Sequence, residues 1–271
     1  MKHLRSLWIL SILLLGLSSR GAELGQEEIH DLFSQGKELF RQANEVVAKD
    51  PPQARNLYRQ AALRFERIAN EGGIQNGKLF YNIGNAYSRL GEIGRAILYY
   101  RKAEQFIPND INLQQNLDFA RRQRLDKLEA PENEKVMETL FFWHYDVPAS
   151  VRGGIFLVTF LGVWGIAAVR LFWKRSWMDW TMMGCGLVAA CLLASLIVES
   201  RRLEGQRPGV VLSNEVVARK GDSSSYESAF RDPLHAGVEF TLVEERSDWL
   251  HVRLPDGREC WLPGDSVGMV R

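Results

Sequence analysis

The sequence predicts a multidomain chain: an exported all-α helical array, two transmembrane helices and a small all-β domain. Three observations predict it. Apolar residues recur at helical spacing between positions 29 and 128, two long runs at 153–169 and 180–198 lack ionisable side chains, and short β-type runs separated by turn residues fill 209–271. With 25% charged and 46% hydrophobic residues among 271, the chain is neither disordered nor a disulfide-rich miniprotein.

The charge is balanced and excludes one class of partner. Residues 22–149 carry a net −2 and residues 199–271 a net −3, within a total of +1. Binding to nucleic acid through counterion release needs a dense basic face, so no nucleic-acid partner is expected. The cysteines fit neither a disulfide framework nor a metal-ligand spacing. They are Cys185, Cys191 and Cys260.

The N-terminus has the pattern of an export signal. Lys2 and Arg5 precede a Leu-rich uncharged run, and the small residues Ser19 and Gly21 follow it. This predicts a secretory signal peptide over residues 1–21. An uncleaved signal anchor is the alternative, although the run is short for the ~20 residues that span a bilayer. In both cases the next domain is exported.

Residues 27–128 are predicted to form the helical array. One 34-residue block, 77–110, carries an ordered set of aromatic, small and turn residues: Phe80, Ile83, Gly84, Tyr87, Ala96, Tyr100, Ala103 and Pro108. Two antiparallel helices are expected to press together at Gly84 and Ala96. The block resembles the tetratricopeptide repeat. A degenerate repeat precedes it, with Gly36 in its first helix.

Residues 111–128 are expected to form a terminal cap helix with a polar face. Its basic cluster is Arg121, Arg122, Arg124 and Lys127. A solvated face is the expected role for this cluster, with a membrane or partner contact as the alternative.

The tetratricopeptide resemblance implies a concave groove that binds a peptide. The residues it places there are Tyr81, Asn85, Ser88 and Arg89. Asn85 can donate to and accept from a ligand backbone, and it can equally cap or bridge neighbouring helices.

A linker or interfacial segment is predicted at 129–150, and transmembrane helices at 151–171 and 178–198. The short connection between the helices holds Arg170, Lys174 and Arg175 against Asp179 alone, so the positive-inside bias puts it in the cytoplasm. This topology leaves three further basic residues on the opposite side of the membrane, which the positive-inside bias disfavours: Arg201, Arg202 and Arg207. Aromatic residues flank the first helix at both ends, as interfacial belts do, although 140–145 fits an ordinary core segment equally well.

The second apolar run carries a stripe of small residues. Gly186, Ala190 and Ala194 recur every four residues, which suits close packing of another helix. The first transmembrane helix is the expected neighbour, and a homo-oligomer seam is the alternative.

After a polar linker at 199–208, residues 209–271 are predicted to form a small β-barrel, with a hairpin turn at 254–258. The order of its turns and tryptophans resembles the bacterial SH3-like domain, which commonly has glycine where this chain has Cys260. The departure at Cys260 indicates that this position is buried and closely approached by neighbouring residues. Trp249 and Trp261 either hold a peptide or cell-wall strand or belong to the core.

No pattern of catalytic residues is present in the sequence. The histidines lack metal-ligand spacing, and neither a nucleophile elbow nor a phosphate-binding glycine loop occurs. We therefore expect no enzyme, no cofactor and no metal site.

The complete order resembles the aerotolerance-operon tetratricopeptide proteins of the Bat E type. Residues 81–87 and 96–100 are the most specific part of this likeness. The resemblance implies a protein of the bacterial cytoplasmic (inner) membrane. The export signal, the two apolar helices and their cytoplasmic connection predict a two-pass topology with both soluble domains on the periplasmic, outer side. The resemblance also implies work beside von Willebrand A-type membrane proteins and a MoxR-type ATPase. Two functions follow as hypotheses: a membrane-anchored protein-interaction scaffold, or a peptidoglycan sensor or tether.

Overall fold

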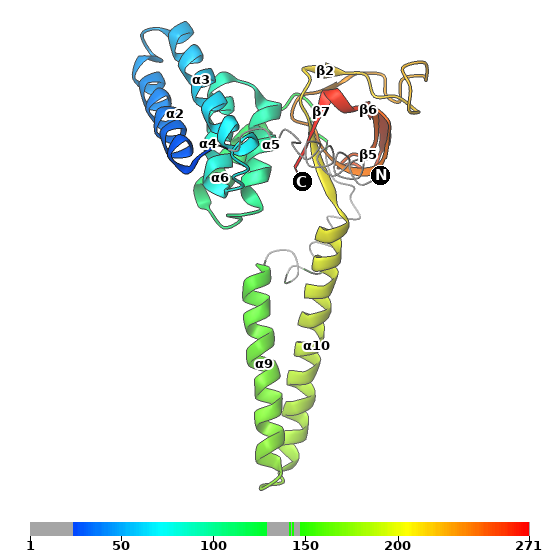
Figure 1. Cartoon of the computed structure of the whole chain (residues 1–271). Helices are drawn as coiled ribbons and strands as arrows, with labels where there is room; N and C mark the ends of the chain where they lie inside the picture. Colours follow the sequence, from blue (N-terminus) through cyan, green and yellow to red (C-terminus); the bar gives the residue numbers. More distant parts are fainter. Residues whose placement is uncertain (1–23, 129–140, 142, 144–146, 271) are drawn as a thin grey trace, which may run out of the picture.

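The computed structural model describes residues 24–128, 141, 143 and 147–270. The signal peptide predicted over 1–21 and most of the segment predicted at 129–150 lie outside the described residues. Figure 1 shows a helical domain beside a β domain, with a long helical hairpin extending from the β domain.

The helical domain is the predicted all-α array, and each helix packs against the next along the chain. Its helices are α2 (Gln26–Val46), α3 (Pro51–Asn70), α4 (Gly77–Leu90), α5 (Ile93–Glu104) and α6 (Ile111–Arg122). Side chains cap several of the helix starts: Asp50 accepts from the backbone N–H of Gln53, and Asp110 from that of Leu113. Gly91 ends α4 in a left-handed conformation, with φ of 78°.

Two glycines allow close approaches between these helices. A Cβ on Gly84 of α4 would lie 2.6 Å from the ring of Tyr100 on α5. A Cβ on Gly36 of α2 would lie equally close, 2.6 Å, to the ring of Phe65 on α3. The contact predicted at Gly84 is therefore present, and Gly36 makes a matching contact in the preceding helix pair.

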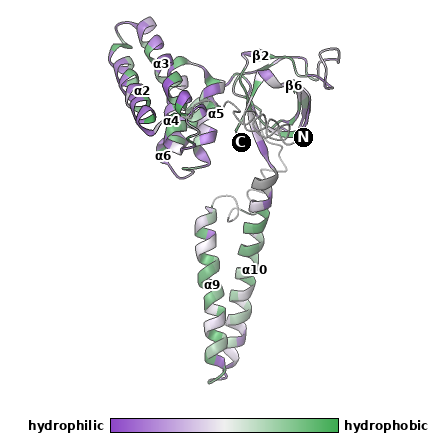
Figure 2. Ribbon diagram, in the orientation of Figure 1, coloured by the Kyte–Doolittle hydropathy of each residue, from purple (hydrophilic) through white to green (hydrophobic). Residues whose placement is uncertain are grey.

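Two helices, α9 (Ala149–Arg170) and α10 (Ser176–Gly205), are long and apolar enough to cross a membrane. Only 6% and 17% of their apolar windows are buried, whereas a core helix of a water-soluble domain is mostly buried. Figure 2 shows apolar residues along both helices. Arg170 and Asp179 form an ion pair of 2.8 Å beside the turn that joins them.

The small-residue stripe of α10 does not face α9, contrary to our expectation. Ala190 and Ala194 are exposed, and Gly186 is half-buried with nothing within 4 Å of an added Cβ, whereas Ala189, Leu192 and Ser195 are buried in the hairpin. The physical reason lies at one end of the hairpin, where a buried arginine of α9 bonds to Ser195 and to a glutamate of α10. Turning these polar groups inward avoids exposing a charge to lipid and turns the stripe outward.

The β domain follows α10 almost directly. It comprises β1 (Arg207–Val211), β2 (Glu215–Val216), β3 (Leu234–His235), β4 (Glu239–Arg246), β5 (Trp249–Arg253), β6 (Glu259–Pro263), η1 (Gly264–Ser266) and β7 (Val267–Met269). The main sheet is antiparallel in the order β6-β5-β4-β1-β7, and β2 pairs with β3. The predicted hairpin at 254–258 joins β5 to β6.

The polar linker expected at 199–208 is not a separate linker. Helix α10 continues to Gly205 and strand β1 begins at Arg207. Residues 199–204 include Arg, Leu and Glu, which are strong helix formers and extend the helix beyond its apolar part.

Candidate functional site

A groove of about 250 Å³ lies on the helical domain between α2 and α4. It is lined by cationic, amide and aromatic side chains: Lys37, Phe40, Arg41, Asn44, Phe65, Asn82 and Asn85. Arg41 is paired with Glu38 and Glu45 on its own helix. Such a lining combines N–H donors with aromatic side chains. N–H donors suit the carbonyl and carboxylate oxygens of an extended protein segment.

Asn85 lies in the groove and also bridges three helices. Its Oδ1 accepts from the hydroxyl of Tyr100 at 2.8 Å and from Nδ2 of Asn116 at 2.9 Å. Asn116 of α6 also donates to the hydroxyl of Tyr81 at 3.0 Å. Burial raises the pKa of Tyr100, which keeps its phenol protonated as a donor. Asn85 therefore bridges neighbouring helices, one of the two roles expected for it, and its side chain also lines the groove.

The other residues expected in the groove have different positions. Tyr81 is half-buried, with its ring 6.1 Å from that of Tyr100 and its hydroxyl bonded to Asn116. Ser88 is half-buried and Arg89 is exposed near the end of α4. Of the four predicted residues, the groove lining includes only Asn85.

Sequence reasoning missed the α2 side of the groove. Gly36 and Gly84 occupy matching close contacts, so the residue after each glycine holds the same place in its repeat: Lys37 corresponds to Asn85. Aligning the degenerate repeat by its glycine would have found Lys37. The extra residues in the turn before α3 obscured that alignment.

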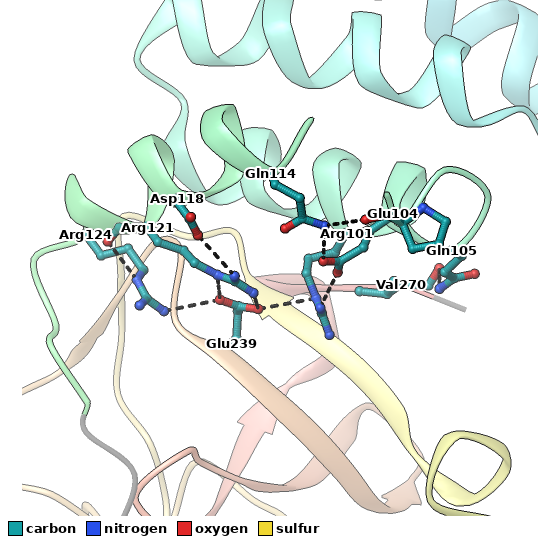
Figure 3. Close-up of polar contacts among 10 residues, drawn as sticks. Arg101, Glu104, Gln105, Gln114, Asp118, Arg121, Arg124, Glu239 and Val270 are labelled. Atoms are coloured by element: carbon teal, nitrogen blue, oxygen red, sulfur yellow. Dashed lines mark hydrogen bonds and ion pairs between the residues drawn. The ribbon is translucent and has the colours of Figure 1, made fainter. Parts of the chain in front are cut away.

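A second polar cluster joins the helical domain to the β domain (Figure 3). Glu239 of β4 accepts from Arg121 at 2.8 and 2.9 Å, and lies 3.3 Å from Arg101 and 3.4 Å from Arg124. Burial alone would raise the pKa of Glu239, but Arg121, Arg101 and Arg124 together hold it below the ordinary value. The carboxylate therefore stays charged in the contact.

This cluster corrects in part the role expected for the basic residues of the predicted 111–128 helix, of which α6 covers Ile111–Arg122. Arg121 and Arg124 are half-buried against Glu239, whereas Arg122 and Lys127 are exposed, as expected for a solvated face. The sequence pattern alone does not distinguish a basic residue exposed to water from one that pairs with a carboxylate 118 residues further along the chain.

Further contacts extend the same junction. Asp126 accepts from the backbone N–H of His235 at 2.7 Å and lies 3.1 Å from its Nδ1. A Cβ on Gly94 of α5 would lie 2.6 Å from the backbone oxygen of Val211, and Val210 belongs to the hydrophobic core of the helical domain. The two domains therefore share a close-packed interface, and both lie at the same end of the α9–α10 hairpin (Figure 1).

The two tryptophans of the β domain differ in burial: Trp261 is a buried residue of its core, whereas Trp249 is half-buried. Trp261 is 9% exposed, stacked on His251 at 4.9 Å and covered by Arg246 at 5.2 Å. Trp249 is half-buried and borders a cavity of about 580 Å³. Cys260 also belongs to the core, and burial raises the pKa of its thiol to about 12.

The geometry defines a protein class: a helical domain with a polar groove, locked to a small β domain at one end of a membrane-type helical hairpin. No protein-family model matches the chain, and no curated protein matches it.

Proposed function

We propose that the protein is a membrane-anchored interaction scaffold whose groove between α2 and α4 binds an extended segment of a partner protein outside the cytoplasmic membrane. The observation that carries this proposal is the groove itself. Its lining comes from two successive helix pairs, in which Lys37 and Asn85 hold corresponding positions, each directly after a close-contact glycine. The resemblance to tetratricopeptide repeats supports the same reading.

The interface between the helical domain and the β domain also supports this proposal. Because Glu239 and the arginines tie the helical domain to β4, and β1 follows α10 directly, the groove is held at a set place relative to the membrane helices. A scaffold needs such a fixed presentation, since preorganised sites bind with less loss of conformational entropy.

The test uses the full-length protein in detergent extract, with partners captured and identified by mass spectrometry. Replacing Lys37 and Asn82 by alanine removes two donors from the groove without touching the Asn85 network. The matched control replaces Lys49 and Asn70, an exposed lysine and asparagine outside the groove, by alanine. We expect capture to fall about tenfold for the groove variant, as for one lost charge-assisted hydrogen bond, and to persist for the control.

Equal capture by both variants would exclude the groove. The Bat E-type resemblance makes von Willebrand A-type membrane proteins and a MoxR-type ATPase system the partners to look for first in the captured fraction.

A peptidoglycan sensor or tether is the second candidate. The half-exposed Trp249 beside its cavity favours it, while the cover over Trp261 reduces the aromatic surface available to a glycan strand. Retention of the full-length protein on purified sacculi, compared with a Trp249→Ala variant, tests this function. Unchanged retention of the variant would remove Trp249 from the cell-wall hypothesis.

A further inference from the structure

Two asparagines that line the groove between α2 and α4 have their side-chain oxygens already bonded to the fold. Oδ1 of Asn44 accepts from the hydroxyl of Tyr58 at 2.7 Å, and Oδ1 of Asn85 accepts from the hydroxyl of Tyr100 at 2.8 Å. Both tyrosines are only 1% exposed, so water does not compete for either bond. A carboxamide carries its oxygen and its NH2 group on opposite sides, so an oxygen held inward turns Nδ2 outward, toward the groove.

Packing holds the rings of the two tyrosines in place. The Tyr58 ring meets Phe40 edge-on, with 5.2 Å between ring centroids, and Phe40 is itself part of the groove lining. The Tyr100 ring lies against Gly84, where an added Cβ would come within 2.6 Å of it. Each hydroxyl therefore donates from a set position, and such a donor selects one of the two orientations that an asparagine amide can take.

The charges of the groove favour the same kind of ligand atom. Lys37 is exposed, and no ion pair within the described residues includes it. Arg41, in contrast, is already paired with Glu38 and Glu45 on its own helix. The lining contains no aspartate or glutamate. The groove thus offers one uncompensated cation and two oriented NH2 groups, all of which require hydrogen-bond acceptors from a ligand.

A groove with this polarity discriminates between an acid and its amide. An aspartate or glutamate side chain of a bound segment has acceptor atoms only, and N–H donors form charge-assisted hydrogen bonds to it. An asparagine or glutamine side chain brings an NH2 group that finds no acceptor opposite Asn44 or Asn85, and it leaves Lys37 without a counter-charge. If the two amides were free to turn, the groove would accommodate both kinds of side chain.

We propose that Tyr58 and Tyr100 are positioning residues that set the polarity of the groove, and that the partner segment it binds is acidic. The two phenols are buried and lie outside the groove lining, so they act through Asn44 and Asn85, whose NH2 groups they keep turned toward the segment. The inference rests on the proposed function of this groove and adds to it the chemical class of the segment, one that carries aspartate or glutamate side chains.

The test presents immobilised full-length protein in detergent with a library of short peptides randomised at every position, and mass spectrometry identifies the retained peptides. The measured quantity is the ratio of Asp and Glu to Asn and Gln among them, relative to the input library. We expect the wild type to favour the acids about tenfold, as for one charge-assisted hydrogen bond. Tyr58→Phe and Tyr100→Phe keep the rings but remove the hydroxyls, so each should lower this ratio about threefold.

The matched control is Tyr99→Phe, which removes a phenol hydroxyl that bonds to Glu66 at 2.7 Å, away from the groove lining. It should keep the wild-type ratio. Asn44→Asp separates positioning from a purely structural role, because the carboxylate still accepts from Tyr58 while an acceptor replaces the NH2 group. Acidic peptides should then lose their advantage, with the thermal melt close to that of the wild type.

The outcomes separate this inference from the proposed function. An unchanged acid preference in both tyrosine variants, or in Asn44→Asp, would overturn the positioning role. Equal retention of acids and amides by the wild type, with retention still lost when Lys37 and Asn82 are replaced by alanine, would overturn the inference and leave the proposed function standing. Absent retention, or retention that does not depend on Lys37 and Asn82, would overturn both.

Discussion

Arg121 of α6 and Glu239 of β4 are 118 residues apart in the chain and form a two-bond ion pair, with N–O distances of 2.8 and 2.9 Å. Between them in sequence lie both membrane helices. The pair therefore closes a loop through the hairpin and joins the first soluble domain to the last. If α9 and α10 cross a membrane, this contact puts both domains on the same side of it.

Replacing Glu239 by glutamine should loosen this junction. The amide keeps the shape but leaves three arginines without their shared carboxylate, so we expect a loss of about 2–4 kcal/mol of stability, as when one partner of a buried pair is removed. Denaturant unfolding of the full-length protein in detergent measures it. Glu244→Gln on the same strand, where the carboxylate pairs only with the exposed Arg246, is the control and should change stability by less than about 1 kcal/mol. Similar losses for both variants would show that the junction does not depend on the cluster.

The same contact should depend on pH. The folded pKa of Glu239 lies below its ordinary value of 4.5, so folding favours the charged form. Its contribution to stability is full above pH 4.5 and is lost as the pH falls through the lowered folded pKa. Comparing the unfolding free energy of wild type and Glu239→Gln across this range measures the contribution of Glu239. A difference that stays constant down to acid pH would contradict the assignment.

Gly84→Ala should destabilise the helical domain. The added Cβ would lie 2.6 Å from the Tyr100 ring, and relieving that overlap in a packed core costs about 1–3 kcal/mol. Gly25→Ala, where nothing lies within 4 Å of the new Cβ, is the control. Thermal melts followed by circular dichroism compare the two, and an unshifted melt for Gly84→Ala would mean that α4 and α5 separate more easily than their packing indicates.

Arg152 of α9 pairs with Glu199 and bonds to Ser195 of α10, and its side chain is only 3% exposed. Arg152→Leu leaves Glu199 without this charge partner and should weaken the hairpin by about 3 kcal/mol. Adding Glu199→Leu should restore most of that loss, because the uncompensated charge is then gone. Resistance to unfolding in a denaturing detergent reports hairpin stability. Failure of the second change to restore it would assign the loss to packing.

The topology prediction uses single cysteines in a background without Cys185, Cys191 and Cys260. Cysteines at Ser34 and Ser224 should react with a membrane-impermeant reagent added to whole cells, whereas one at Ser176, the first residue of α10, should be protected. All three serines are exposed in the fold. Protection at Ser34 would contradict export of the helical domain and move the partner search to the cytoplasm.

Local pattern was enough to predict the helical array, the two apolar helices, the β5–β6 hairpin and the close approach at Gly84. Each of these depends on residues near one another in the chain: a periodicity of 3.6, an uncharged run, a turn signal, or a small residue at a helix crossing. The groove was predicted only in part, since Asn85 lines it while Lys37 lay in a repeat whose altered turn obscured the alignment.

What the sequence by itself determined is therefore the type and order of the elements, because backbone propensity and apolar spacing are encoded within each segment. Only the tertiary structure decided which polar residues pair with one another. It directed Arg121 to Glu239 and turned Arg152 toward Glu199, leaving the Ala190 and Ala194 stripe on the outside. The physical reason is that a charge removed from water must find its partner in space, and that partner is set by how the elements pack rather than by their spacing in the chain.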